Sequence, residues 1–145
     1  MREIKFKGQQ LSNGDWIVGD LNHLVDGVYI SNDNGNNMAQ VNPDTVCQFT
    51  GFLDKNGKEI YEGDILRSDE YPFSCMDDGE RDNYFGIIEW SNEEAMFVLT
   101  CVKNPKSAVR GISDGISDEI TQQKLDGFEI VGDIHNTEWK SKLNL

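Results

Sequence analysis

The segment from Val46 to Arg67 constrains the fold more than any other part of this sequence. It places short apolar stretches on both sides of a polar turn, Asp54-Lys55-Asn56-Gly57-Lys58. An Asn-Gly pair adopts positive φ angles at low cost, and between two apolar stretches it is a strong short-range signal for a β-hairpin. The sequence therefore predicts that the chain reverses here, between a strand at Phe52-Leu53 and a strand at Glu59-Ile60-Tyr61.

Short strands and polar turns continue along the rest of the chain. Clusters of Gly, Asn and Asp separate the strands at short intervals, a spacing typical of a barrel or a sandwich. Residues 2 to 21 are predicted to form an opening hairpin. Further strands are expected at residues 28–30, 48–52, 65–67, 84–90, 95–99 and 128–134. The pattern predicts a mainly β protein, with an N-terminal hairpin region at about 2–30 and a core at about 41–135.

One short α-helix is predicted near Ser117. The Ser117 hydroxyl can accept hydrogen bonds from the first free amides of a helix, and Asp118 suits the positive end of the helix dipole. Gly127 is expected to end the segment. The tail from Asn136 is expected to be a docked turn or a frayed end. No repeat or linker divides the 145 residues, so a single domain covering residues 1–145 is expected.

The charge of the chain limits its partners. There are 26 acidic and 13 basic residues, which give a formal net charge of -13 at pH 7. The excess is even, since residues 1–72 carry 12 acids and 6 bases and residues 73–145 carry 14 acids and 7 bases. Binding along a nucleic-acid backbone needs clustered Lys and Arg, so direct binding to DNA or RNA is not expected. The same field repels anionic membranes and attracts basic partners.

The cysteines and the first residues bear on the compartment. Cys47, Cys75 and Cys101 are odd in number and form no C-x-x-C pair, which indicates reduced thiols of the cytosol. The start of the chain lacks the apolar segment of a secretion signal, and the apolar runs are too short to cross a bilayer. A cytoplasmic protein is therefore expected.

The acidic segment at residues 68–83 contains the only metal-site candidates that the sequence offers. They are Asp77, Asp78, Glu80 and Asp82. The segment lacks the alternate oxygen positions, the mid-loop Gly and the terminal Glu of an EF-hand. We therefore expect a solvated loop inserted into the core, with no metal site and no cofactor. The open alternative is a weak Ca²⁺ or Mg²⁺ site, or a metal-dependent hydrolase built from these carboxylates.

No catalytic arrangement is visible in the sequence, so no catalytic residue is assigned and a non-enzymatic protein is expected. His23 and His135 lie in apparent turns, outside any G-x-S-x-G or H-E-x-x-H motif. Neither phosphate-binding glycine motif occurs. Three tryptophans, Trp16, Trp90 and Trp139, are interpreted as core residues, with a stacking platform for nucleic-acid bases as the alternative.

Several of these stretches together resemble a known family. They are residues 1–8, the stretch Asn13-Gly14-Asp15-Trp16-Ile17-Val18-Gly19-Asp20-Leu21, the run from Val41 to Asp64, and Phe128-Glu129-Ile130-Val131-Gly132-Asp133-Ile134-His135. The most specific part is Thr45 to Asp64. In these residues the chain resembles the YopX family of phage and prophage proteins. The likeness departs at Cys47, at His135-Asn136 and across residues 68–83.

The resemblance implies a mainly β fold with an SH3-type barrel, carriage by a phage or an integrated element in a bacterial cell, and self-association. It carries over no catalytic residue. The function that follows is a homo-oligomeric accessory protein whose partners are itself and another phage or host protein. An alternative is an acidic decoy that inhibits a nucleic-acid-binding protein of the host. The turns of residues 45–64 are interpreted as maintaining the fold, because their Gly, Asn and Asp residues lie where turns need them, with a binding face as the alternative.

Overall fold

The computed structural model describes residues 1–69, 84–103 and 117–145 and divides the chain into two compact units. Unit 1 covers Met1–Gly51 and unit 2 covers Phe52–Leu145. The units are described separately here. The expectation of a single domain over residues 1–145 stays a prediction.

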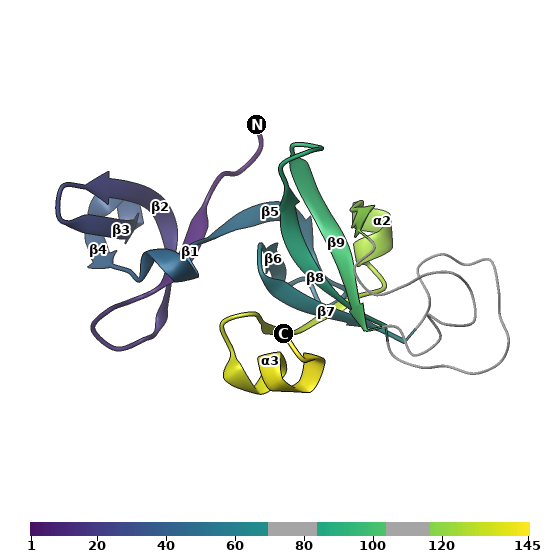
Figure 1. Ribbon diagram of the computed structural model, residues 1–145. Helices are drawn as coiled ribbons and strands as arrows, with labels where there is room; N and C mark the ends of the chain where they lie inside the picture. Colours follow the sequence, from purple (N-terminus) through teal and green to yellow (C-terminus); the bar gives the residue numbers. More distant parts are fainter. Residues whose placement is uncertain (70–83, 104–116) are drawn as a thin grey trace, which may run out of the picture. The chain divides into compact units, whose positions relative to one another are not determined.

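Unit 1 is an antiparallel sheet in the order β4-β3-β2-β1-β5. Strands β2, β3 and β4 lie side by side in Figure 1, next to β1. The strands are β1 (Phe6–Gln9), β2 (Trp16–Leu24), β3 (Gly27–Asn32), β4 (Asn37–Gln40) and β5 (Cys47–Leu53), with 3-10 turns at Asp33–Gly35 and Pro43–Thr45. The opening hairpin is confirmed, because β1 and β2 pair antiparallel from Phe6↔Gly19 to Gln9↔Trp16.

Strand β2 changes partner in its middle, and Gly19 lies at the change. Residues before it pair with β1, and Asp20 to Leu24 pair with β3. A Cβ atom at Gly19 would overlap the carbonyl group of Ser31, so only glycine allows β3 to approach this closely. The bend wraps the sheet around a small core of Ile17, Ile30 and Val41.

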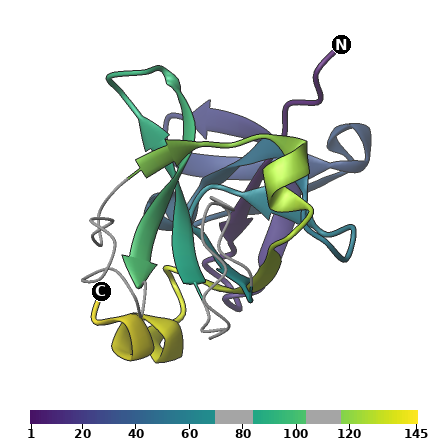
Figure 2. The same cartoon turned by 90° about the vertical axis from the view of Figure 1, so that its right-hand side faces the viewer.

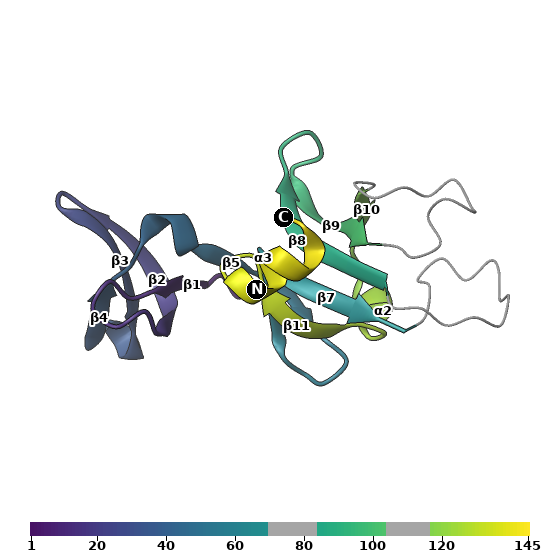
Figure 3. The same cartoon turned by 60° about the horizontal axis from the view of Figure 1, so that its bottom comes forward.

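Unit 2 contains the second antiparallel sheet, in the order β10-β9-β8-β7-β11. Figure 2 shows the long β8–β9 hairpin, and Figure 3 shows β11 beside β7. The strands are β6 (Glu59–Tyr61), β7 (Asp64–Ser68), β8 (Tyr84–Ser91), β9 (Met96–Lys103), β10 (Ser117–Glu119) and β11 (Glu129–Asp133). Neighbouring residues on one strand face opposite sides. Leu66 therefore joins one hydrophobic cluster, with Leu99 and Phe128, while Ile65 joins another, with Leu143.

The predicted helix near Ser117 is wrong in position. Ser117 begins β10, where it pairs with Thr100 and its hydroxyl lies 2.9 Å from the Thr100 hydroxyl. The helix there is α2 (Gln122–Leu125), and the side chain of Thr121 caps it. Pairing with β9 overrides the local capping signal at Ser117, because a cap contributes only about 1 kcal/mol.

A second helix was not predicted. The tail expected as a turn or frayed end forms α3 (Thr137–Leu143), whose N-cap Asn136 accepts a hydrogen bond from the amide of Glu138. Its Leu143 is buried, and its Trp139 packs against the same cluster, over Gly132. The expectation of a single short helix is therefore corrected to two among the described residues.

The predicted strand-turn-strand segment is confirmed as a hairpin between β5 and β6. Strand β5 ends at Phe52 and Leu53, and β6 is the next strand in the sheet. The prediction that both residues of the Asn56-Gly57 pair adopt a positive φ is wrong in one part. Gly57 has a φ of 78°, but Asn56 does not adopt a positive φ. The mainly β class is thus confirmed. Both strand orders are open among the described residues, so an SH3-type barrel is not shown.

Candidate functional site

The acidic candidates from the sequence, Asp77, Asp78, Glu80 and Asp82, lie outside the described residues. Within residues 1–69, 84–103 and 117–145, no group of three or more His, Cys, Asp or Glu side chains is arranged to hold a metal ion. The predictions about the acidic loop stay predictions.

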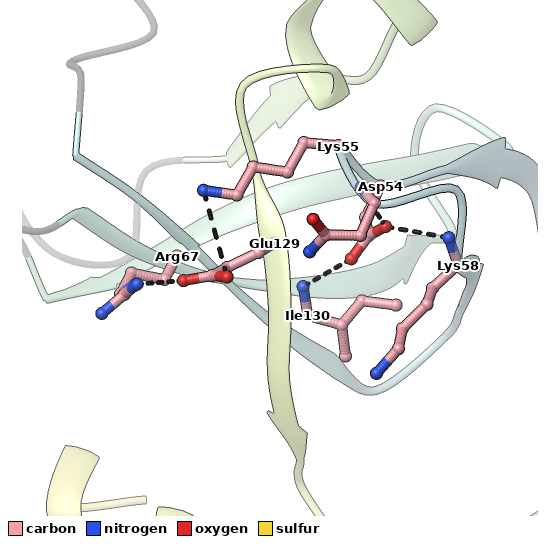
Figure 4. A network of polar contacts seen from close by, with 7 residues as sticks. Asp54, Lys55, Lys58, Arg67, Glu129 and Ile130 are labelled. Atoms are coloured by element: carbon pink, nitrogen blue, oxygen red, sulfur yellow. Dashed lines mark hydrogen bonds and ion pairs between the residues drawn. The ribbon is translucent and has the colours of Figure 1, made fainter.

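The best-connected polar group of unit 2 is the carboxylate of Asp54, which is almost completely buried (Figure 4). Its Oδ1 accepts hydrogen bonds from the amides of Asn56, at 2.8 Å, and Lys58, at 2.9 Å. Its Oδ2 accepts one from the amide of Ile130, at 3.0 Å. Asp54 therefore holds the turn after β5 and ties it to β11, and its lone pairs are used for fold maintenance rather than for a ligand.

Beside Asp54 lies a small ion-pair network centred on Glu129 (Figure 4). Its carboxylate pairs with the guanidinium of Arg67 and lies 3.9 Å from the Lys55 ammonium. The Nε of Arg67 is buried and has no hydrogen-bond partner among the described residues. The network is partly exposed, and a partly exposed pair of this kind contributes little stability.

Two histidines and two cysteines lie in the described part of the chain. His23 is exposed on β2 of unit 1, and His135 follows β11 in unit 2, where its amide donates to Asp133 Oδ1. Cys47 and Cys101 are buried, and the thiol of Cys47 lies 3.2 Å from the carbonyl oxygen of Thr45. Cys75 lies outside the described residues.

The three tryptophans are divided between the two units. Trp16 lies in unit 1 under the Lys7 ammonium, which is 4.8 Å from its ring centre. In unit 2, Trp90 meets Phe97 edge to face, and Trp139 packs against Phe85 in the cluster that contains Leu143. Trp16 and Trp139 are partly buried, but Trp90 is 45% exposed, so its interpretation as a core residue is wrong.

The most prominent surface of unit 1 is the side of its sheet that faces away from the core. Core positions on β2, β3 and β4 are Ile17, Leu21, Val28, Ile30 and Ala39. Because side chains alternate along a strand, the residues between them point to the other side. Among these are Asn22 and Leu24 on β2, Tyr29 and Ser31 on β3, and Met38 and Gln40 on β4. We call these six residues the outer face.

The register confirms that the outer face is continuous across three strands. Asn22 pairs with Tyr29, which pairs with Gln40, and Ser31 pairs with Met38. The Asn22 amide donates to the Ser31 hydroxyl at 3.0 Å. These cross-strand contacts place the six side chains on one surface.

The outer face is uncharged in a strongly acidic protein, and it presents exposed apolar side chains beside neutral polar ones. Leu24 is 49% exposed and Met38 is 50% exposed. Strands β3 and β4 contain no charged residue, and residues 34–43 contain none either. The nearest charged residues are Asp20, which continues the face on β2, Asp26 at the β2–β3 turn, and Asp33 in the connection between β3 and β4. A surface without charge that presents exposed Met and Leu beside a half-buried Tyr has the composition of a protein contact.

Asp26 is engaged at the rim of the outer face. The Tyr29 hydroxyl donates to Asp26 Oδ2 at 3.0 Å, and the Gln40 amide approaches the Asp26 carbonyl at 3.3 Å. The hydrogen bond to this carboxylate raises the pKa of Tyr29 above its ordinary value. Sequence reasoning missed the outer face because β4 lacks β-branched residues, so no strand was predicted there.

No helix among the described residues has the length and apolar character needed to cross a membrane.

A family model described as YopX protein matches residues 2–138 of the chain. No functionally curated protein matches it. A solved structure that matches the chain is the crystal structure of protein EF1440 from Enterococcus faecalis, at 19% identity and a TM-score of 0.47, covering 93% of this chain and 95% of that one.

Proposed function

The chain belongs to the YopX family, and from this premise we propose that it is a non-enzymatic accessory protein of a phage or prophage. It acts in the cytoplasm of the bacterial host as a homo-oligomeric protein-interaction module. The SH3-type barrel that the family likeness implied at the sequence level belongs to the same proposal.

The observation that carries this proposal is the outer face of unit 1. Scattered exposed apolar residues are normal on a monomer, but an uncharged, continuous sheet surface with a half-exposed Leu24 and Met38 is a contact surface by composition. The buried carboxylate of Asp54 accepts hydrogen bonds from three backbone amides. It therefore supports a structural reading over a catalytic one.

Two measurements test the proposed function. Light scattering of the purified chain over a concentration series is expected to show a mass above that of the 16.4 kDa monomer. Affinity purification of the tagged chain from phage-infected or lysogenic cells, followed by mass spectrometry, is expected to identify a protein partner. A clean monomer at high concentration together with no recovered partner would contradict the proposal.

A second candidate function is supported by the net charge of -13. An acidic protein can occupy the nucleic-acid groove of a basic host enzyme, because it presents carboxylates where phosphates would lie. This decoy function predicts binding to a host nuclease or polymerase that weakens steeply as salt is raised. Binding that is absent, or that does not depend on salt, would eliminate the decoy.

The metal-dependent hydrolase stays the least supported alternative, since its carboxylates Asp77, Asp78, Glu80 and Asp82 lie outside the described residues. Calorimetric titration with Ca²⁺ and Mg²⁺ tests it directly. We expect no binding heat in the millimolar range, and a saturable heat that is lost in a variant with all four residues changed to Asn or Gln would revive this alternative.

A further inference from the structure

We infer that the outer face of unit 1 is the surface through which two copies of this chain pair, sheet against sheet, around a two-fold axis. The inference rests on the proposed function, because it names the contact by which the chain self-associates. Its occupant is a second copy of the outer face itself, with Leu24 and Met38 of both copies in the contact.

The distribution of charge over the chain favours a second copy over other partners for the outer face. Each copy carries a net charge of -13, so two copies repel each other through most of their surfaces. The repulsion is smallest where neither copy presents carboxylates, and strands β3 and β4 present none. A basic partner would gain nothing from this surface and would be attracted to the acidic remainder of the chain.

The shape and chemistry of the outer face also suit a two-fold contact. In such a contact the same patch is used by both copies, so it must be complementary to itself. Side chains of Leu, Met and Tyr pack against their own kind. The Gln40 amide is both a donor and an acceptor, so it can bond its counterpart, whereas Asn22 Nδ2 already donates to the Asp20 carbonyl oxygen and to the Ser31 hydroxyl, which leaves its Oδ1 as an acceptor. The Asn22 amide is already oriented by Ser31, which limits the entropy lost on association.

Asp20 is the carboxylate that continues the face on β2, where it pairs with Ser31. A two-fold contact centred on β3 and β4 leaves it at the margin, where solvent screens it. A basic residue, Lys7, lies on the same side of the sheet on β1, where it pairs with Val18. The charged positions thus lie on β1 and β2 and in the two connections that flank β3, at Asp26 and Asp33, while strands β3 and β4 themselves contain none.

A charge-swap experiment at Met38 tests the inference. Met38 is half exposed, so its replacement by Glu or Lys is tolerated by the fold. We expect sedimentation velocity to show that Met38→Glu and Met38→Lys each raise the dissociation constant by at least about tenfold, since like charges then meet in the contact. An equimolar mixture of the two variants is expected to associate again, because opposite charges now meet.

Leu53→Glu is the matched control, since Leu53 in unit 2 is exposed to a similar extent, 41%, and lies outside the outer face. It is expected to associate as the unchanged chain does. Leu24→Lys is the second variant and is expected to weaken association as Met38→Lys does. Circular dichroism of each variant reports whether it is folded.

The outcomes separate this inference from the proposed function. If the unchanged chain associates and the Met38 and Leu24 variants associate equally well, the outer face is not the contact, although self-association stands. If the mixture of Met38→Glu and Met38→Lys stays dissociated, the symmetric contact is overturned. An unchanged chain that is monomeric at all concentrations overturns both self-association and this contact.

Discussion

The two units of the chain differ in how they divide charge and apolar surface. Unit 1 has six acidic and three basic residues, a net charge of -3, while unit 2 has a net charge of -10. Most of the exposed large apolar side chains among the described residues belong to unit 1, including Leu11, Leu24, Val25 and Met38. Although the acidic residues look evenly spread along the sequence, the outer face of unit 1 contains none of them and is therefore available for contact.

The interiors differ as well. Unit 1 has one small cluster of buried residues, Ile17, Ile30 and Val41. Unit 2 has clusters on both sides of its five-stranded sheet, one of which includes Leu66 and Phe128. Larger buried apolar area gives more stabilisation, at about 25 cal/mol per Å². Unit 2 is therefore expected to be the more stable unit, and unit 1 the one that presents the contact surface.

The largest expected effect is the loss of the buried carboxylate in unit 2. Asp54→Ala leaves the amides of Asn56, Lys58 and Ile130 without their acceptor. We expect the free energy of unfolding to fall by about 3 kcal/mol, because each unsatisfied buried donor costs about 1 to 3 kcal/mol and the turn can relax partly. Urea denaturation followed by circular dichroism measures it.

Asp54→Asn is the control for this prediction. It keeps one acceptor oxygen but places an NH₂ donor against an amide, so an intermediate loss is expected. Amide hydrogen exchange of the Asp54→Ala variant then compares the two units. We expect the amides of β7 and β8 in unit 2 to lose protection while those of β2 and β3 in unit 1 keep theirs. An equal loss of protection in both units would contradict their description as two separate units.

In unit 1, the largest expected effect is at the bend of β2. Gly19→Ala would push a methyl group into the carbonyl of Ser31, so β2 and β3 must separate. Overpacking of this kind costs about 1 to 3 kcal/mol. Hydrogen exchange of β3 amides is the measurement. The matched control is Gly127→Ala, whose methyl group meets only the Lys124 carbonyl oxygen at an ordinary 3.6 Å, and unchanged β3 protection in Gly19→Ala would refute the close approach.

A smaller effect is expected where α3 covers the sheet of unit 2. A methyl group at Gly132 would overlap the indole of Trp139, which lies against the glycine backbone. Since a side chain gives way more easily than a carbonyl group, Gly132→Ala is expected to cost about 1 kcal/mol and to displace α3. Trp139 fluorescence tests this, and an emission spectrum identical to that of the unchanged chain would show that the indole is placed elsewhere.

The smallest expected effect is electrostatic and lies within α3. The Lys142 ammonium, 2.6 Å from Glu138 Oε1, lowers the pKa of Glu138 through a hydrogen bond and its charge. Because the folded pKa is lowered, the stabilising contribution is present above the unfolded pKa and is lost as the pH falls through the folded pKa.

Carbon-detected NMR titration of Glu138 measures this directly. The pKa is expected below the ordinary glutamate value in the unchanged chain and at the ordinary value in Lys142→Met. Since both side chains of the pair are exposed, thermal stability at neutral pH is expected to change little in this variant. Equal Glu138 pKa values in the two proteins would contradict the ion pair.

Much of the fold could be predicted from local signals. The Asp54 to Lys58 turn, the opening hairpin and the last strand follow from turn chemistry and alternation, which act over a few residues. The helix start was misplaced because the pairing of Ser117 with Thr100 joins residues far apart in sequence. Helix α3 did carry a signal, since Asn136 is a good N-cap and Glu138 lies in the first turn.

The candidate surface was harder to predict than the fold. Alternation on β2 shows that Asn22 and Leu24 point to one side, but not which strands lie beside them. The outer face exists only because β4, with Met38 and Gln40, pairs with β3 in a particular register. Register depends on the whole sheet and on its core, so a single sequence did not reveal it.

The most direct test of the central claim is a dilution series followed by methyl NMR. If the outer face of unit 1 is where two copies meet, the Met38 and Leu24 methyl signals shift with concentration, and those of Leu53 and Leu66 in unit 2 do not. Shifts confined to unit 2 methyls, with Met38 and Leu24 constant while the mass increases, would contradict the account.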